Sequence, residues 1–222
     1  MKNQKTLLRT ACLALIVTLL ATAALCFAGC GKEPAKVDMT EIAKEINSLK
    51  TTDFEESSST TEYVRITVKN HGDIVLRLRE DIAPETVKNF RKLVSEKFYD
   101  GLTFHRIIPG FMIQGGDPNG NGTGSTTPVK GEMTANGFEN NLTHIRGVLS
   151  MARRGGDYNS GSCQFFICNA DAPHLNGEYA SFGYVVAGME TVDSISAVAT
   201  NAANNAPTES VVMEKVCFVK QK

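Results

Sequence analysis

The chain has 222 residues, of which 42% are hydrophobic and 21% are charged. This composition is typical of a globular protein and allows for one folded domain with additional segments. The 23 basic and 24 acidic residues give a formal net charge of −1, so the chain has no broad positive field with which to attract nucleic acid. Nucleic acid is therefore not expected among its partners.

The first thirty residues have the composition of a targeting segment. Three basic residues, Lys2, Lys5 and Arg9, precede the apolar run LALIVTLLATAALCFAG. Basic residues followed by such a run predict a secretory signal peptide. The run is also long enough to be an uncleaved anchor helix, which remains the alternative.

The end of this run resembles the lipobox of bacterial lipoproteins. Ala28 and Gly29 stand immediately before Cys30, although Phe27 replaces the leucine that is usual at its position. The resemblance implies a signal peptide over residues 1–29 and a diacylated Cys30 as the mature N-terminus. We therefore expect a lipoprotein held by acyl chains such as palmitate on the extracytoplasmic side of the cell membrane.

The charge of the mature chain bears on how it would attach to a membrane. Cleavage before Cys30 would remove three basic residues and leave 20 basic and 24 acidic residues, a formal charge of −4. Such a chain would not favour anionic lipid through its own charge. Attachment would instead depend on two or more acyl chains, in which each buried CH₂ group contributes about 0.8 kcal/mol.

Residues 30–61 are expected to form a flexible tether after the lipidated cysteine. Their composition shifts to Lys, Glu, Ser and Thr and ends in EESSSTT, which buries little apolar surface. Within this segment Met39, Ile42, Ile46 and Leu49 recur at near-helical spacing. A short amphipathic helix lying on the domain and a solvated segment are therefore both possible.

The folded domain is predicted over residues 62–222. YVRITVKN and IVLRLR alternate in period two around HGD and predict a β-hairpin. APETVKNFRKLVSEKF has one apolar face and Pro84 near its start, which predicts a helix. A second helix is expected at METVDSISAV, and short strands at GVLSMAR, CQFFIC, SFGYVV and SVVMEKVCFV. Many short strands with few helices indicate a barrel or a sandwich.

Several local patterns have some of the residues of a metal site or a nucleophile site, but none has all the residues that such a site requires. DPNGNG, from Asp117 to Gly122, begins like a calcium loop, but the twelfth position is Pro128, which cannot supply the bidentate carboxylate. The four histidines lack metal-ligand spacing, and no serine or cysteine stands in a nucleophile elbow. We therefore expect neither a metal nor another cofactor.

The cysteines beyond the lipid site do not indicate a disulfide framework. Only Cys163, Cys168 and Cys217 remain, and this number is odd. Cys163 and Cys168 are five residues apart, so on a strand they would point to opposite faces and could not bridge each other. They are expected to be buried as small hydrophobic residues.

The stretch FHRIIPGFMIQGGD places an arginine among apolar residues. Strand alternation in FHRII puts Phe104, Arg106 and Ile108 on one side. An unpaired guanidinium buried in an apolar core would be very costly, so this side should face a groove. The alternative is a partly exposed arginine whose head pairs with a carboxylate, such as Glu132 or Glu139.

Several blocks resemble the cyclophilins, in the order in which that family has them. They are FHRIIPGFMIQGGD, then GTG at residues 122–124, LSMAR, SCQFFIC and HLNGEYASFGYVV. Cyclophilins are peptidyl-prolyl cis/trans isomerases. The resemblance, which runs from about Glu62 to the end of the chain, implies a mainly β fold, a closed eight-stranded antiparallel β-barrel capped by two α-helices.

The resemblance also implies roles for individual residues. Arg106 takes the place of the catalytic arginine, and Gln114 that of the polar residue beside it that orients the substrate. The other positions that match substrate-binding residues of the family are the pocket walls Phe111, Met112 and Phe166, the floor Leu175, and the neighbouring Ala152 and Gln164.

Three positions depart from the best-known pattern of the family. Arg153 stands where asparagine is frequent, and there the backbone carbonyl is expected to bind the substrate. His174 stands where many members have tryptophan, which argues against tight cyclosporin binding. Tyr179 replaces a histidine at the rim of the pocket and still offers a flat wall and a donor.

The resulting hypothesis is a monomeric, lipid-anchored isomerase that accelerates X-Pro rotation in exported polypeptides. Its partners would be proline-containing polypeptides and, through the lipid anchor, the membrane. The alternative is a non-catalytic module that binds proline-containing peptides or serves as a scaffold on the cell surface.

Overall fold

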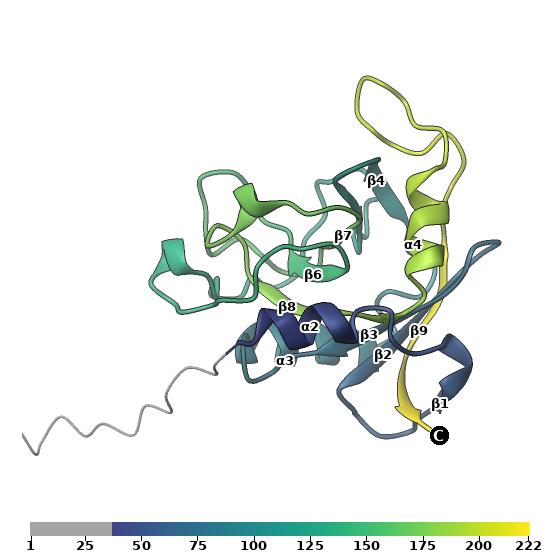
Figure 1. Ribbon diagram of the computed structural model, residues 1–222. Helices are drawn as coiled ribbons and strands as arrows, with labels where there is room; N and C mark the ends of the chain where they lie inside the picture. The colour runs from purple at the N-terminus through teal and green to yellow at the C-terminus, as the bar shows by residue number, and fades with distance from the viewer. Residues whose placement is uncertain (1–36) are drawn as a thin grey trace, which may run out of the picture. The chain divides into compact units, whose positions relative to one another are not determined.

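The computed structural model describes residues 37–222. The predicted signal peptide, Cys30 and the first residues of the predicted tether lie outside this range. Within it, nine strands form one antiparallel sheet in the order β1-β9-β2-β3-β8-β6-β7-β5-β4. Strands β9, β2 and β3 of this sheet lie side by side in Figure 1. The strands are β1 (Phe54–Glu56), β2 (Tyr63–Val68), β3 (Gly72–Leu78), β4 (Phe104–Ile108), β5 (Met112–Gly115), β6 (Val148–Met151), β7 (Phe165–Cys168), β8 (Ser181–Ala187) and β9 (Met213–Gln221).

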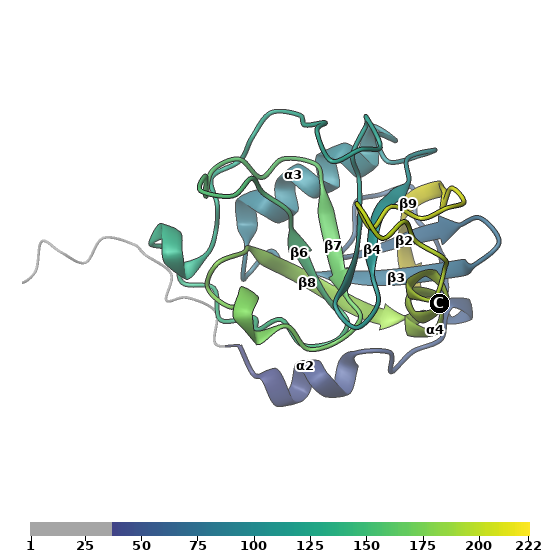
Figure 2. The same cartoon turned by 90° about the horizontal axis from the view of Figure 1, so that it is seen from above.

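Three α-helices and three 3₁₀ turns complete the described part of the chain. Figure 2 shows the strands between α3 on one side and α2 on the other. No helix of residues 37–222 is both long enough and apolar enough to cross a membrane. The helices are α2 (Met39–Glu45), α3 (Pro84–Ser95) and α4 (Met189–Ser196), and the 3₁₀ turns are η1 (Thr51–Asp53), η2 (Thr134–Asn136) and η3 (Pro173–Leu175).

The predicted hairpin and both predicted helices are present. β2 and β3 pair in register, with Val64 opposite Leu76 and Ile66 opposite Ile74, and all four side chains are buried. This agrees with period-two alternation of apolar residues on a half-buried strand. Pro84 is the first residue of α3, where its missing N–H has no helical partner to lose.

Helix α3 receives its N-terminal cap from a residue far along the chain. The buried carboxylate of Glu132 accepts hydrogen bonds from the backbone N–H groups of Glu85 and Thr86, at 3.0 and 2.8 Å, and from the Thr86 hydroxyl at 2.7 Å. A carboxylate at this place satisfies free N–H groups and interacts favourably with the helix dipole. Glu132 is thereby committed to α3.

The structure corrects the prediction of a flexible tether up to residue 61. Within that segment, α2, η1 and β1 form, and β1 pairs with β9. Ile42 and Phe54 are only 3% and 2% exposed. Of the two possibilities for the near-helical pattern, the structure has the amphipathic helix. A few well-placed apolar side chains dock this segment, although its average composition is polar, so the folded domain begins before residue 62.

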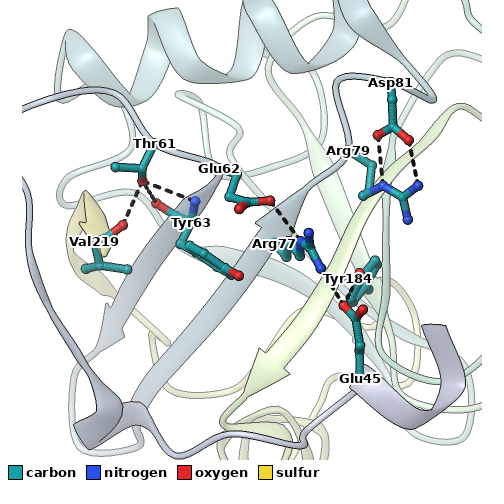
Figure 3. A network of polar contacts seen from close by, with 9 residues as sticks. All are labelled: Glu45, Thr61, Glu62, Tyr63, Arg77, Arg79, Asp81, Tyr184 and Val219. Carbon is teal, nitrogen blue, oxygen red and sulfur yellow. Dashed lines mark hydrogen bonds and ion pairs between the residues drawn. The ribbon is translucent and has the colours of Figure 1, made fainter. Parts of the chain in front are cut away.

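Polar contacts join α2 to the sheet. Figure 3 shows Glu45 reaching from α2 to Arg77 of β3 and Tyr184 of β8. Arg77 Nη1 lies 2.7 Å from Glu45 Oε2 and its Nε lies 2.8 Å from Glu62 Oε2, while the Tyr184 hydroxyl donates to Glu45. Burial alone would raise the pKa of Glu45, but the hydrogen bonds from Tyr184 and Arg77 outweigh it and lower that pKa. The charged carboxylate is therefore stabilised in this position.

Strand β4, at one end of the strand order, approaches β9, the strand next to the other end, through a few hydrogen bonds. Thr103, before β4, forms a single bridge with Val212, before β9. The Phe104 N–H donates to the Val211 carbonyl at 2.9 Å, and the Met213 N–H to the Leu102 carbonyl at 2.8 Å. In the described sheet, β4 and β1 are not paired with each other. Residues 37–222 are mainly β, with nine strands and three α-helices rather than the predicted eight and two, and barrel closure stays a prediction.

Truncation of the apolar residues that dock the N-terminal segment tests this correction. We expect Ile42→Ala and Phe54→Ala each to lower the free energy of unfolding by about 3 kcal/mol, the usual cost of removing a buried side chain of this size. Urea denaturation followed by circular dichroism measures this change. Glu41→Ala on the exposed face of α2 is the matched control and should change stability by at most about 0.5 kcal/mol. Equal stability of all three variants would instead support the prediction of a flexible tether.

Candidate active site

A β-bulge in β4 determines the direction in which the Arg106 side chain points. Phe104 is opposite Gly115, but Arg106 is opposite Gln114, so β4 has one residue more than β5 between these pairs. Phe104 and His105 are consequently both buried, and Phe104 joins the main core together with Ile107. The prediction that Phe104 and Arg106 share a side is therefore wrong, because the bulge breaks the alternation. Arg106 and Ile108 are partly exposed.

Arg106 makes only neutral contacts. Its Nη1 donates to Gln114 Oε1 at 3.2 Å and lies 3.8 Å from Met112 Sδ. The carboxylates considered as partners are engaged elsewhere, since Glu132 caps α3 and Glu139 accepts a hydrogen bond from Asn141 at 2.8 Å. The guanidinium is thus not held in an ion pair with either.

The other arginines of the described part of the chain differ from Arg106 in this respect. Residues 37–222 contain eight arginines, and seven of them form ion pairs with carboxylates. A guanidinium has five donors and stays charged at all ordinary pH values. Arg106 is therefore the one arginine of this range whose charge is left for a ligand.

A chain of amide side chains holds the partner of Arg106 in place. Gln114 Nε2 donates to Gln164 Oε1 at 3.0 Å. Gln164 Nε2 in turn donates to the backbone carbonyls of Gly124, at 2.8 Å, and Gly122, at 3.1 Å. With its nitrogen engaged in this way, Gln114 presents its oxygen to Arg106.

A pocket of about 190 Å³, lined by both apolar and polar side chains, opens beside the guanidinium. One water occupies about 30 Å³ in the liquid, so the pocket has room for a small ring of five or six atoms. The strand order β6-β7-β5-β4 brings its walls together from distant parts of the chain. The pocket is lined by Arg106, Phe111, Met112, Gln114, Ala152, Arg153, Phe166, Leu175 and Tyr179.

The sequence predicts eleven catalytic and substrate-binding residues. Nine of them line this pocket, and the other two, Gln164 and His174, lie next to it. Gln164 lines a larger neighbouring cavity of about 600 Å³, which Gln114, Ala152 and Arg153 also border. His174 is exposed and does not line the pocket, but its ring packs on Phe111 with 5.3 Å between the ring centroids. His174 therefore adjoins the pocket at the Phe111 wall.

The loop that resembled a calcium site is stabilised by its own backbone. Asp117 is buried and accepts hydrogen bonds from the N–H groups of Asn119 and Asn121, at 3.0 and 2.9 Å, and from that of Gly122. Burial alone would raise the pKa of Asp117, but these hydrogen bonds outweigh it and lower that pKa. The carboxylate therefore shapes the wall of the larger cavity. Among residues 37–222 no three His, Cys, Asp or Glu side chains are grouped as metal ligands.

The cysteines lie as expected from their spacing. Cys163 and Cys168 are free, fully buried and belong to different apolar clusters. Burial raises the pKa of the Cys168 thiol to about 12. Both act as small hydrophobic residues, whereas Cys217 is free and partly exposed.

A buried histidine behind the pocket could not be recognised from the sequence. His144 is 1% exposed and stacks on Phe166, with 6.0 Å between centroids and 17° between planes. Its Nδ1 lies 3.1 Å from Asn176 Oδ1 and its Nε2 lies 3.0 Å from Ser150 Oγ. Burial lowers the pKa of His144 to about 4, so a neutral imidazole supports the Phe166 wall at ordinary pH.

The protein matches known proteins along most of its length. The sequence model of the family described as cyclophilin type peptidyl-prolyl cis-trans isomerase/CLD matches residues 63–217. Peptidyl-prolyl cis-trans isomerase B of Bacillus subtilis is 48% identical over 130 residues, which are 58% of this chain and 87% of that protein. The protein of the same name from Escherichia coli is 44% identical over 160 residues, with coverages of 66% and 94%.

A solved structure has the same fold. The crystal structure of a cyclophilin type peptidyl-prolyl cis-trans isomerase of Cryptosporidium parvum, in the presence of the dipeptide Ala-Pro, superposes with a TM-score of 0.65 and 32% identity. It covers 70% of this chain and 98% of that chain. With the family match, this shows that the chain belongs to the cyclophilins and is a peptidyl-prolyl cis-trans isomerase. Helix α2 and strand β1 precede the matched residues.

The depressed pKa of His144 makes stability depend on pH. An unfolded histidine titrates near pH 6.5, so between about pH 6.5 and pH 4 the unfolded state binds a proton that the folded state excludes. The free energy of unfolding should therefore fall by up to about 3 kcal/mol as the pH is lowered from about 6.5 to about 4.

Urea titrations at several pH values measure this loss, with His144→Gln as the comparison. The variant should have a smaller slope of stability against pH in this range. A residual slope is expected from His105, whose pKa is also lowered by burial. The same slope in both proteins would contradict the assignment to His144.

Proposed function

We propose that the pocket beside Arg106 holds the proline ring of the substrate and that Arg106 stabilises the twisted prolyl amide. The observation that carries this proposal is a guanidinium without an ion pair beside a pocket with several apolar walls, while the other arginines of residues 37–222 are paired. Gln114 orients the guanidinium and the substrate backbone. The remaining lining residues hold the ring and the neighbouring peptide.

The chemistry of this reaction requires no bond to be broken. Amide resonance imposes a barrier of about 20 kcal/mol on X-Pro rotation, which unaided takes tens of seconds or more. Resonance is lost when the amide twists and the proline nitrogen becomes pyramidal. A guanidinium that donates to that nitrogen, or holds the adjoining carbonyl, binds the twisted state more tightly than either planar state.

The apolar walls make this donor effective. Met112, Phe166 and Leu175 are at most 7% exposed, so a ring held against them displaces water from the guanidinium. A charge acts more strongly where water is excluded. A ten-thousandfold acceleration corresponds to about 5.5 kcal/mol, which a charged hydrogen bond and fixed orientation together can supply.

The substrates of this proposal are proline-containing segments of exported polypeptides. The Cryptosporidium parvum relative was crystallised in the presence of Ala-Pro, which supports a proline-containing ligand at the equivalent pocket. The N-terminal sequence supports export, with cleavage after residue 29 and acylation of Cys30. The protein would then act as a monomer held by its acyl chains at the outer face of the membrane.

Replacement of the arginine tests the catalytic role. We expect Arg106→Ala to lower kcat/KM roughly a hundredfold, because one preorganised charged donor to the transition state is lost. The measurement is a protease-coupled isomerisation assay with an X-Pro peptide. Arg146→Ala removes an ion pair with Asp193 outside the pocket and should leave the rate unchanged.

The same variant separates catalysis from simple binding. A non-catalytic binding module or scaffold would lose no function with Arg106→Ala as long as the pocket stays intact. An unchanged isomerisation rate for a folded Arg106→Ala variant would show that Arg106 contributes at most to binding and not to catalysis.

The lipid anchor is tested separately by labelling cells with a palmitate analogue. The native chain should take up the label, whereas Cys30→Ala should not, because the acylated thiol is lost. Label retained by the Cys30→Ala chain would show that Cys30 is not the acylated residue.

A further inference from the structure

One basic side chain of the pocket is enclosed by the protein itself. The Arg153 side chain is only 7% exposed. Its Nε donates to the Glu178 carbonyl at 3.0 Å, its Nη1 to the Arg154 carbonyl at 3.1 Å, and its Nη2 lies 3.3 Å from Glu178 Oε2. The guanidinium thus ties the loop after β6 to the segment between η3 and β8.

Two tyrosine rings enclose the same guanidinium. Arg153 Cζ lies 4.6 Å from the ring centroid of Tyr158 and 4.6 Å from that of Tyr179. Cations at this distance over an aromatic face are attracted by the ring. The Tyr158 hydroxyl donates to Glu178 Oε2 at 3.1 Å, so the carboxylate holds both the cation and one of the rings. We call Arg153, Tyr158 and Glu178 the arginine clamp.

The clamp acts on a wall of the proline pocket. Tyr179 lines the pocket, and its ring meets Phe166 edge-on, with 5.7 Å between centroids and 83° between planes. Tyr179 is itself partly exposed and stands just before β8. A partly exposed tyrosine can change rotamer at little cost unless something holds its ring. The guanidinium of Arg153 lies against that ring.

We propose that Arg153 is a positioning residue that fixes Tyr179 against Phe166 and so sets the width of the pocket. This inference rests on the proposed function, since it takes the pocket as the site of the proline ring. The role expected from the sequence for Arg153 involves only its backbone carbonyl and not its side chain. Glu178 pairs with the charge of Arg153. The Arg153 guanidinium therefore supports the Tyr179 wall and does not compete with Arg106 for the substrate.

The protein contains a matched arrangement outside the pocket. Arg77, Glu45 and Tyr184 also combine an arginine, a carboxylate and a tyrosine hydroxyl on that carboxylate (Figure 3). Arg77 does not line the pocket. Replacement of Arg77 therefore measures the structural effect of losing such a group, without any effect on the tyrosine wall.

The test compares Arg153→Met with Arg77→Met in steady-state kinetics on an X-Pro peptide. Methionine keeps much of the apolar stem and removes the charge. We expect Arg153→Met to raise KM about fivefold, the effect of losing one cation–π and hydrogen-bonded contact, with kcat changed less than about twofold. Arg77→Met should lower the denaturation midpoint and leave KM unchanged. An unchanged KM for Arg153→Met, or a loss in kcat alone, would overturn the inference.

A double-mutant cycle shows whether Arg153 acts through the tyrosine ring. In a Tyr179→Ala background the further change Arg153→Met should raise KM little, because the wall is already absent. Additive effects would contradict the clamp. Glu178→Gln weakens the same clamp and should raise KM by a smaller factor, which provides the test if Arg153→Met does not fold.

The inference and the proposed function fail in different ways. If Arg106→Ala keeps full kcat, the catalytic assignment of the pocket is wrong, whatever Arg153 does. If Arg106→Ala loses kcat while Arg153→Met leaves KM unchanged, the catalytic assignment stands and only the clamp is wrong.

Discussion

The pairing of Arg106 with Gln114 across β4 and β5 is the contact on which the site depends. It exists because the bulge at His105 shifts the register by one residue, so that Phe104 enters the core while Arg106 faces the pocket. Without that shift, the guanidinium would compete with apolar side chains for the interior, at a large desolvation cost. Gln164 and the glycine-rich loop then fix the orientation of Gln114.

Charge pairing explains why this arginine differs from the others. The remaining arginines of residues 37–222 have their charges balanced by nearby carboxylates. Arg153 illustrates the difference, because it lines the same pocket but is bound by Glu178 and enclosed by two tyrosines. Of the two guanidinium groups that line the pocket, that of Arg153 is ion-paired and that of Arg106 is not.

The sequence predicts much of this arrangement where a local pattern carries the signal. Alternation in β2 and β3 gives the hairpin, and the apolar face of α3 with Pro84 gives the helix. The resemblance to cyclophilins identifies eleven catalytic and substrate-binding residues, and nine of them line the pocket. Their spatial grouping depends on the strand order, which no local pattern contains.

Other features could not be predicted because they depend on contacts between distant segments. The docking of residues 38–56 rests on a few buried side chains such as Ile42 and Phe54, which the polar composition of the segment conceals. The bulge at His105 is a property of pairing with β5. The role of His144 depends on its stacking on Phe166, and that of the Arg153 side chain on Glu178, which is 25 residues away. Burial and partners decide such roles, and both appear only in the folded chain.

The most direct measurement is a crystal structure of the protein with a bound X-Pro peptide. We expect the pyrrolidine ring to lie against Phe166 and Leu175, with a guanidinium nitrogen of Arg106 about 3 Å from the prolyl amide nitrogen or the adjoining carbonyl oxygen. A peptide bound with its proline outside this pocket, or an Arg106 turned away into an ion pair, would contradict this expectation.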